Sequence, residues 1–387
     1  MSFLSFLAQY KWVIIFYALI ILFIIVKRKK FIFQAKFIAL YRTKVGLKII
    51  DRIGTKYSEF VKILGYAGIG IGYAGMLFIL YFIIKGLYDL VFVPSAPPVI
   101  TPVLPGIPIP GSPIFVPFWY GIIALFFVVL VHEFSHGIVA KAHKLPVLNS
   151  GIVFFGPLIG AFVEPDEKKL RKQSDVVQYS IFAAGPFSNI ILAAFVILLF
   201  IVIFNPIANA YAQPMGFVFT SLEKGLPAET SGLEANVLYN QVNGIFVNST
   251  EEFVKVFDKL KVNETLTIGN SEKTYALVAT SKEAAPDKPV IGVNLRTKYT
   301  NEENTLMKIF LWLVGLFTWI FMLSLGLGLA NLLPIGPVDG GRMLQVSLNK
   351  TMGEENGNKV WTKITMLMIV FILILLIIPI VRAVLKL

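Results

Sequence analysis

Cysteine is absent from this chain of 387 residues, and histidine occurs only three times. The missing thiols exclude disulfide frameworks and thiolate metal sites, so a metal ion must be held by histidine and carboxylate. Charge is also scarce, since 15% of the residues are charged against about 25% in soluble domains. Instead, 56% are hydrophobic and the mean hydropathy is +0.75, so an ordinary soluble protein is excluded.

Six apolar runs are long enough to cross a bilayer, which takes about 20 residues each. The first is the weakest, because Gln9 and Lys11 interrupt it. The basic run KRKK follows it in place of a cleavage site, which predicts an anchor rather than a signal peptide. We therefore expect an α-helical polytopic membrane protein with about six transmembrane helices, near residues 3–26, 61–84, 114–140, 180–204, 307–333 and 361–384.

The basic residues fall in alternate loops. They crowd segments 27–62, 141–172 and 342–363, whereas the Pro-rich loop 87–113 has none. The positive-inside rule places the basic segments in the cytoplasm. The net charge of +12 is largely this asymmetry, so we expect contact with anionic lipid headgroups and no nucleic-acid binding.

Residues 212–300 change to a mixed, charged composition that predicts a small soluble α+β domain outside the cytoplasm. The pattern predicts a short helix in 225–233, a hairpin turning at Asn243-Gly244, and a helix 249–260 capped by Ser249. It resembles a PDZ domain of membrane and periplasmic proteases, although Glu234-Ala235-Asn236-Val237 replaces the usual Gly-Asp stretch. The resemblance implies a groove for an extended peptide; a spacer or size filter is the alternative.

The sequence HEFSH, residues 132–136, lies inside the third apolar run. His132 and His136 share one face of a helix and are about 6 Å apart along its axis, so they can hold one metal ion. Glu133 beside them suits a general base. Ionisable groups in hydrocarbon are costly unless they pair, bind metal or face water, and their position here therefore favours a function.

A catalytic zinc commonly has three protein ligands and an open position. His143 would lie about 16 Å from His132 along a helix, too far to share the ion. Asp339, within NLLPIGPVDGG at the cytoplasmic end of the fifth span, is the remaining candidate. Broken backbone at this depth is tolerated where it lines a watery cavity, although a solvated turn would also explain an isolated aspartate.

The chain resembles the site-2 protease family of intramembrane zinc metalloproteases. This family has HExxH in one span and Asn-x-x-Pro…Asp-Gly in a later one, and the chain has these motifs at 132–136 and 331–340. The family often carries a PDZ domain between the two motifs. The resemblance covers roughly 114–350. It implies that His132, His136 and Asp339 bind one zinc ion per chain and that Glu133 is the general base.

Two further features follow from this resemblance. AAGPFSN, residues 183–189, matches a family element in which Asn189 would help to stabilise the oxyanion; a helix-packing amide is the alternative. Residues 149–165 resemble a re-entrant β-hairpin beside the active site, turning at Gly156-Pro157, which could pair with an unwound substrate. A connecting loop at the membrane interface is the alternative.

The expected organisation has five parts. Residues 1–113 hold two spans and a basic cytoplasmic loop, 114–211 and 301–350 form the catalytic core, 212–300 is the extracytoplasmic PDZ-like domain, and 351–387 is the last span. The predicted activity is hydrolysis of peptide bonds in or near transmembrane helices of membrane-anchored substrates, with the active site in the cell membrane nearer the cytoplasm. A zinc transporter, which usually has a second ligand cluster, and a non-catalytic scaffold are the alternatives.

The absence of cysteine makes the topology directly testable. A cysteine placed at Ser249 should react with an impermeant reagent in intact cells, and one at Ser58 should not, because the charge pattern puts them on opposite sides. The reverse labelling pattern would invert the orientation.

Overall fold

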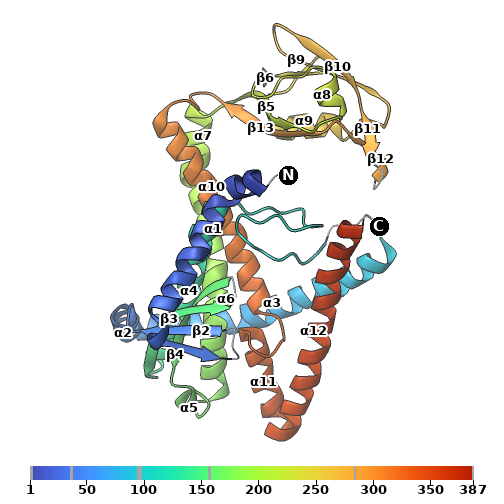
Figure 1. Cartoon of the computed structure of the whole chain (residues 1–387). Coiled ribbons are helices and arrows are strands. Elements are labelled where there is room, and N and C mark those ends of the chain that lie inside the picture. The colour runs from blue at the N-terminus through green and yellow to red at the C-terminus, as the bar shows by residue number, and fades with distance from the viewer. Residues whose placement is uncertain (1–2, 35–37, 94–97, 156–157, 283–284, 386–387) are drawn as a thin grey trace. The chain divides into compact units, whose positions relative to one another are not determined.

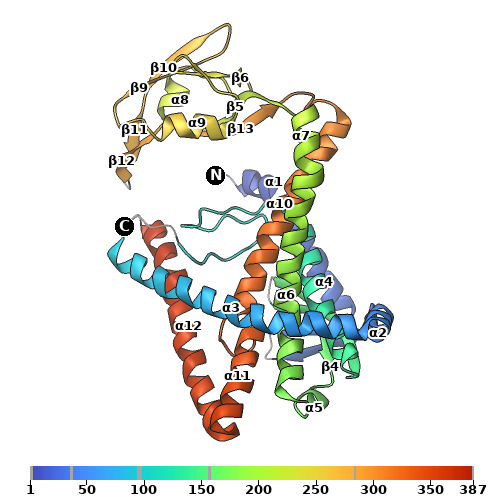
Figure 2. The same cartoon turned by 180° about the vertical axis from the view of Figure 1, so that it is seen from behind.

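The computed structural model describes residues 3–34, 38–93, 98–155, 158–282 and 285–385, and Figures 1 and 2 show it from opposite sides. The chain forms two compact units. One comprises Met1–Leu198 with Gly315–Leu385 and holds both sequence motifs; the other is built on Leu199–Val314.

Five helices in the described part of the chain are long and apolar enough to cross a membrane, and they coincide with the second to sixth expected spans. Helix α1 (Phe3–Val26) covers the first, but its apolar part, Tyr10–Val26, is shorter, so a sixth crossing remains a prediction. The five spans are α3 (Ser58–Phe92), α4 (Phe118–Ala142), α6 (Asp175–Leu199) continued by the π-helical segment Phe200–Phe204 and α7 (Asn205–Tyr211), α10 (Thr305–Asn331) and α12 (Glu354–Leu385).

Helices α3, α4, α6 and α11 (Asp339–Met352) share one buried core. Small residues let the backbones approach closely; a Cβ on Gly65 of α3, for example, would lie 3.2 Å from Val139 of α4. This packing fixes α4 against α6 and α11. The buried members are Val61, Met76, Val139, Ala140, Ala142, Leu145, Leu170, Ile181, Phe182, Ala183, Ala184 and Met343.

A four-stranded antiparallel sheet lies beside α4, with strand order β1-β2-β3-β4. Strands β3 (Val147–Phe155) and β4 (Leu158–Pro165) form the expected hairpin, whose turn residues Gly156 and Pro157 lie outside the described residues. Strands β1 (Phe31–Gln34) and β2 (Ile38–Thr43) extend it by pairing β2 with β3. In this sheet β4 is an edge strand.

The prediction of a basic loop at 27–62 was therefore incomplete. After a short 3-10 turn, Arg28–Lys30, the segment contributes two strands and the amphipathic helix α2 (Leu47–Lys56). Phe31 and Ala39 are buried with Phe154 of β3, against side chains of α1. The alternating aromatic and aliphatic residues of FIF and FIALY were a strand signal, which the surrounding charge obscured.

The backbone breaks between α10 and α11. Asp339 was expected at the end of the fifth span, but that helix ends at Asn331 and Asp339 is the first residue of α11. Two glycines make the tight connection possible. A Cβ on Gly340 would lie 2.2 Å from the carbonyl oxygen of Leu332, and one on Gly341 would lie 1.8 Å from that of Ile335. Only glycine allows this approach, which sets the position of Asp339.

The second unit contains a β-rich module with its own core, which includes Phe217, Phe219, Tyr239 and Phe253. The expected turn at Asn243-Gly244 is confirmed by the pairing of β7 with β8. The predicted cap of α9 is also confirmed, because Ser249 accepts a hydrogen bond from the Glu252 N–H. The elements are β5 (Pro214–Leu222), α8 (Pro227–Thr230), β6 (Leu238–Tyr239), β7 (Gln241–Val242), β8 (Ile245–Phe246), α9 (Thr250–Phe257), β9 (Thr265–Gly269), β10 (Thr274–Val278), β11 (Thr280–Lys282), β12 (Ala285–Val290) and β13 (Val293–Tyr299).

The first and last strands of this module, β5 and β13, pair antiparallel. Just outside them, the Thr300 N–H donates to the Gln213 carbonyl over 2.8 Å. The two ends of the module are therefore adjacent, as a domain inserted between two helices requires.

Replacing Gly341 with alanine should destabilise the protein by about 1–3 kcal/mol, because the added methyl group forces the backbone apart. Gly326→Ala in α10 is the matched control, since a Cβ there has no neighbour within 4 Å. Thermal unfolding in detergent measures the difference. Equal stability of the two variants would contradict the close backbone contact at Gly341.

Candidate metal centre

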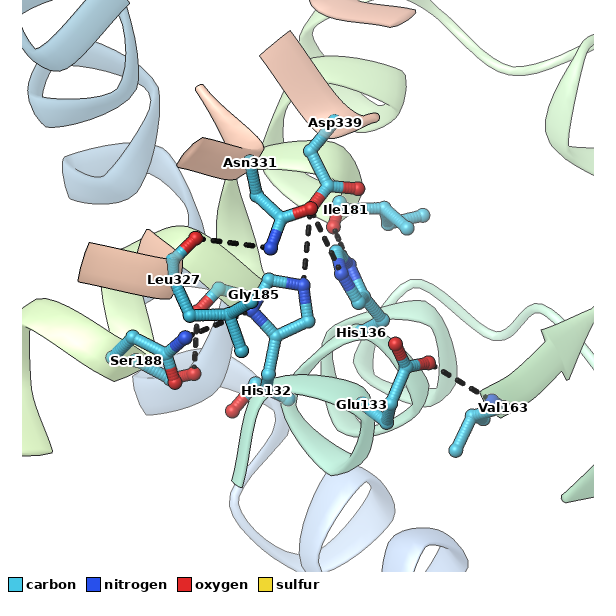
Figure 3. A network of polar contacts seen from close by, with 12 residues as sticks. His132, Glu133, His136, Val163, Ile181, Gly185, Ser188, Leu327, Asn331 and Asp339 are labelled. Atoms are coloured by element: carbon cyan, nitrogen blue, oxygen red, sulfur yellow. Dashed lines mark hydrogen bonds and ion pairs between the residues drawn. The ribbon is translucent and has the colours of Figure 1, made fainter. Parts of the chain in front are cut away.

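His132 and His136 of α4 and Asp339 of α11 form a cluster whose ligand atoms all lie within 4.8 Å of one another. Nε2 of His132 is 3.1 Å and Nε2 of His136 is 3.4 Å from Oδ2 of Asp339. Figure 3 shows both imidazoles turned toward this carboxylate. The helical spacing of the histidines puts them on one face, and the α10–α11 connection brings the carboxylate to them.

The remaining ring nitrogens are held by α6. Nδ1 of His136 lies 2.7 Å from the backbone oxygen of Ile181, and Nδ1 of His132 lies 3.1 Å from the side-chain amide of Asn189. Pro186 lies inside α6 and removes one N–H from its hydrogen-bond ladder, which favours a bend there. Helix α6 thus contacts the Nδ1 atom of both imidazoles, while their Nε2 atoms face Asp339.

Gly185 of α6 packs directly against the two rings. A Cβ at this position would lie 2.3 Å from Nε2 of His136 and 2.6 Å from Nε2 of His132. Any side chain would occupy the place where the histidine nitrogens converge. The space in front of these nitrogens therefore depends on glycine at 185.

Glu133 follows His132 on α4 and lies beside strand β4. Its Oε2 accepts a hydrogen bond from the Val163 N–H over 3.0 Å, as Figure 3 shows. No hydrogen bond joins Oε1 to another residue in the described ranges. One carboxylate oxygen is thus anchored by the edge strand while the other remains available.

The cluster opens into a cavity of about 220 Å³, called here the ligand cavity. Arg342 contacts Glu167 at its wall, and its guanidinium carbon lies 4.1 Å above the ring centre of Phe182. Three potential ligands with an adjoining space have the form of a metal site that keeps one coordination position open. The lining residues are His132, Glu133, His136, Val163, Pro165, Glu167, Leu170, Ile181, Phe182, Asn331, Pro337, Val338, Asp339 and Arg342.

The structure brings His132, Glu133, His136 and Asp339 together, as the sequence predicted. Asn189 is placed differently: it is fully buried and does not line the ligand cavity. His143, which the sequence set aside, follows the end of α4, with its Nε2 3.2 Å from the Ser180 hydroxyl.

Sequence reasoning missed three groups at this site. Asn331 lines the ligand cavity while its amide donates to the Leu327 carbonyl over 3.0 Å; its place in the second motif was the available signal. Arg342, three residues after Asp339 in α11, returns to the same side of that helix. The Ile181 carbonyl left no sequence signal, because a backbone group is common to every residue.

Comparison with known proteins agrees with these features. The profile of peptidase family M50 matches residues 120–375. An uncharacterized protein of Methanocaldococcus jannaschii is 30% identical over 77% of this chain and 74% of its own length. A Staphylococcus aureus protein named "putative zinc metalloprotease" is 23% identical over 56% of this chain and 61% of its own.

Among solved structures, the PDZ domain of the SdrC-like protein from Listeria monocytogenes is 25% identical, with a TM-score of 0.18. It matches 21% of this chain and 86% of its own. The family profile, by contrast, spans most of the chain and includes both sequence motifs. This multi-pass membrane protein therefore belongs to peptidase family M50, the site-2 protease family of metalloproteases.

Proposed function

We propose that this protein is a zinc-dependent intramembrane protease that cleaves membrane-anchored substrates in or near a transmembrane helix. One observation carries the proposal: His132, His136 and Asp339 converge at a cavity that Glu133 also lines, and α4, which supplies three of them, is a membrane-span candidate. Metal ligands and a proton acceptor thus share one space within an apolar helix bundle.

The residues present suit zinc. Two imidazole nitrogens and one carboxylate form a ligand set typical of catalytic zinc, and Gly185 leaves room at the nitrogens. When bound, zinc would lower the pKa of a water molecule to about 7 and polarise a peptide carbonyl. His132, His136 and Asp339 would hold one ion per chain.

Glu133 would move the proton in this reaction. Its carboxylate takes a proton from the attacking water, whose oxygen forms a bond to the scissile carbonyl carbon. The same carboxyl group then gives the proton to the amide nitrogen as the carbon–nitrogen bond breaks. The contact with the Val163 N–H holds this side chain beside the ligand cavity.

Edge strand β4 supports a route for the substrate. Its residues Ile159, Gly160 and Ala161 line an apolar cavity of about 310 Å³ between α1, α4 and the sheet. Further along the same strand, Val163 and Pro165 line the ligand cavity. A substrate helix that places side chains in the apolar cavity could unwind and pair with β4 on its way to the metal site.

The alternatives have less support. The described residues contain one group of three histidine or acidic side chains able to share a metal ion, whereas a transporter usually needs a second ligand cluster along its path. A scaffold would leave Glu133 and its ordered contact without a role.

The module at 212–300 completes the proposal. We place it outside the cytoplasm from the charge pattern, with the active site nearer the cytoplasmic side of the cell membrane. Its PDZ-like sequence pattern supports binding of an extended peptide in a groove, with a size filter as the alternative role. Lipid and a membrane-protein substrate are the expected partners, and nucleic acid is not.

Changing Glu133 to glutamine should preserve the fold and the zinc but lower hydrolysis by about 10²- to 10⁴-fold, because the amide cannot take the proton. Zinc content and cleavage of a model membrane-helix substrate are measured on the same purified protein. The wild type should carry close to one zinc ion per chain.

Ligand variants supply the control for this experiment. His132→Ala with His136→Ala should release zinc, whereas His143→Ala should retain it because His143 lies outside the cluster. Full zinc occupancy in the double variant would place the metal elsewhere, and near-normal cleavage by Glu133→Gln would remove the general-base assignment.

Substrate unwinding provides a separate test. Proline or glycine near the cut, but not at the scissile bond, should speed cleavage because each weakens a helix interior by roughly 1–3 kcal/mol. Leucine at the same positions should slow it. Initial rates are measured in detergent and in bilayers on substrates that differ only at these positions. Equal rates for all substrates in both media would show that helix unwinding does not limit cleavage.

A further inference from the structure

We propose that Asn189 is a positioning residue for His132: its side-chain oxygen accepts a hydrogen bond from Nδ1–H, so that Nε2 faces the metal. This inference rests on the proposed zinc site and assigns Asn189 no contact with the substrate. It differs from the oxyanion role that the sequence resemblance implied.

The argument begins with the two imidazoles. Both direct Nε2 toward Oδ2 of Asp339. Each histidine would therefore bind the metal through its Nε2 atom. A neutral histidine that ligates through Nε2 carries its proton on Nδ1 and needs an acceptor there. For His136 the acceptor is the Ile181 carbonyl oxygen, 2.7 Å away.

His132 needs the equivalent acceptor in a more enclosed place. It is 4% exposed, and Asn189 beside it is fully buried. The amide nitrogen of Asn189 lies 3.1 Å from Nδ1, and its Oδ1 is buried without a hydrogen-bond partner among the described residues. Half a turn about the Cβ–Cγ bond exchanges these two atoms and brings the unpaired oxygen to Nδ1–H.

The surroundings hold Asn189 in this place. The Ser324 hydroxyl of α10 donates to the backbone carbonyl oxygen of Asn189 over 2.8 Å. A Cβ on Gly328 of the same helix would lie 3.2 Å from Cβ of Asn189. Helix α10 therefore packs directly on Asn189, so the amide can turn about its own bond but its Cβ stays fixed.

A direct catalytic contact does not fit this position. Asn189 is absent from the lining of the ligand cavity, whereas His132 is part of it. The amide meets the ring through Nδ1, the nitrogen other than the one directed at Asp339. An interaction with Asn189 therefore reaches the metal through His132, as outer-shell partners of metal-bound histidines commonly do.

The test compares Asn189→Leu with Asn189→Asp in the full-length protein, by zinc competition with a chelator. Leucine removes the acceptor and should weaken zinc binding about 10- to 100-fold. Aspartate keeps an acceptor but cannot donate, so it should hold zinc within a few-fold of the wild type. Ser180→Ala, which removes another buried polar group from α6, should leave zinc affinity unchanged.

Cleavage by the same variants separates the two roles. As a positioning residue, Asn189→Asp should retain most of the activity; as an oxyanion donor, it should lose activity while keeping zinc. Wild-type zinc affinity in Asn189→Leu, zinc affinity in Asn189→Asp no better than in Asn189→Leu, or loss of cleavage in a zinc-loaded Asn189→Asp protein would each overturn the inference.

Two controls keep these outcomes distinct. Thermal unfolding of the zinc-free variants shows whether they are folded, and Asn189→Ala replaces the leucine variant if leucine prevents folding. A wild-type protein that binds no zinc would overturn the proposed function itself, because the proposed reaction requires the ion, and the inference about Asn189 would fall with it.

Discussion

The structure depends on bringing His132 and His136 of α4 together with Asp339 of α11, which lies 207 positions after the first histidine in the chain. Two histidines on one helix turn cannot complete such a site alone, so α11 must meet α4. That meeting takes place over α6, whose Ile181 and Asn189 contact the imidazoles. The packing of α4, α6 and α11 therefore also sets the geometry of the candidate metal centre.

The close packing of these helices explains why glycine occupies three positions near the site. Gly185 leaves space at the two histidine nitrogens, and Gly340 and Gly341 let the start of α11 approach the backbone beyond α10. Each position excludes a Cβ for a local steric reason: Gly185 meets the two imidazoles, Gly340 meets the Leu332 backbone, and Gly341 meets the Ile335 backbone. These three glycines thus act through shape, and the chemistry belongs to the residues beside them.

The features that depend on short-range spacing could be predicted from the sequence. The i, i+4 pair of His132 and His136 and the cap at Ser249 need only local geometry, and the structure contains both. The start of α11 at Asp339 and the pairing of β2 with β3 were missed, because both depend on contacts between distant segments. The contact of Asn189 with His132 had no local signal either, since it joins two helices.

Strand β4 runs from an apolar environment to a polar one. One end of the strand lines an apolar cavity and the other lines the polar ligand cavity. The proposed substrate, a membrane helix, satisfies its own backbone hydrogen bonds and would have to break them before a carbonyl could react. An edge strand offers replacement partners for those groups. The same strand also holds Glu133 through the Val163 N–H, so the element suited to receive unwound backbone also positions the proposed base.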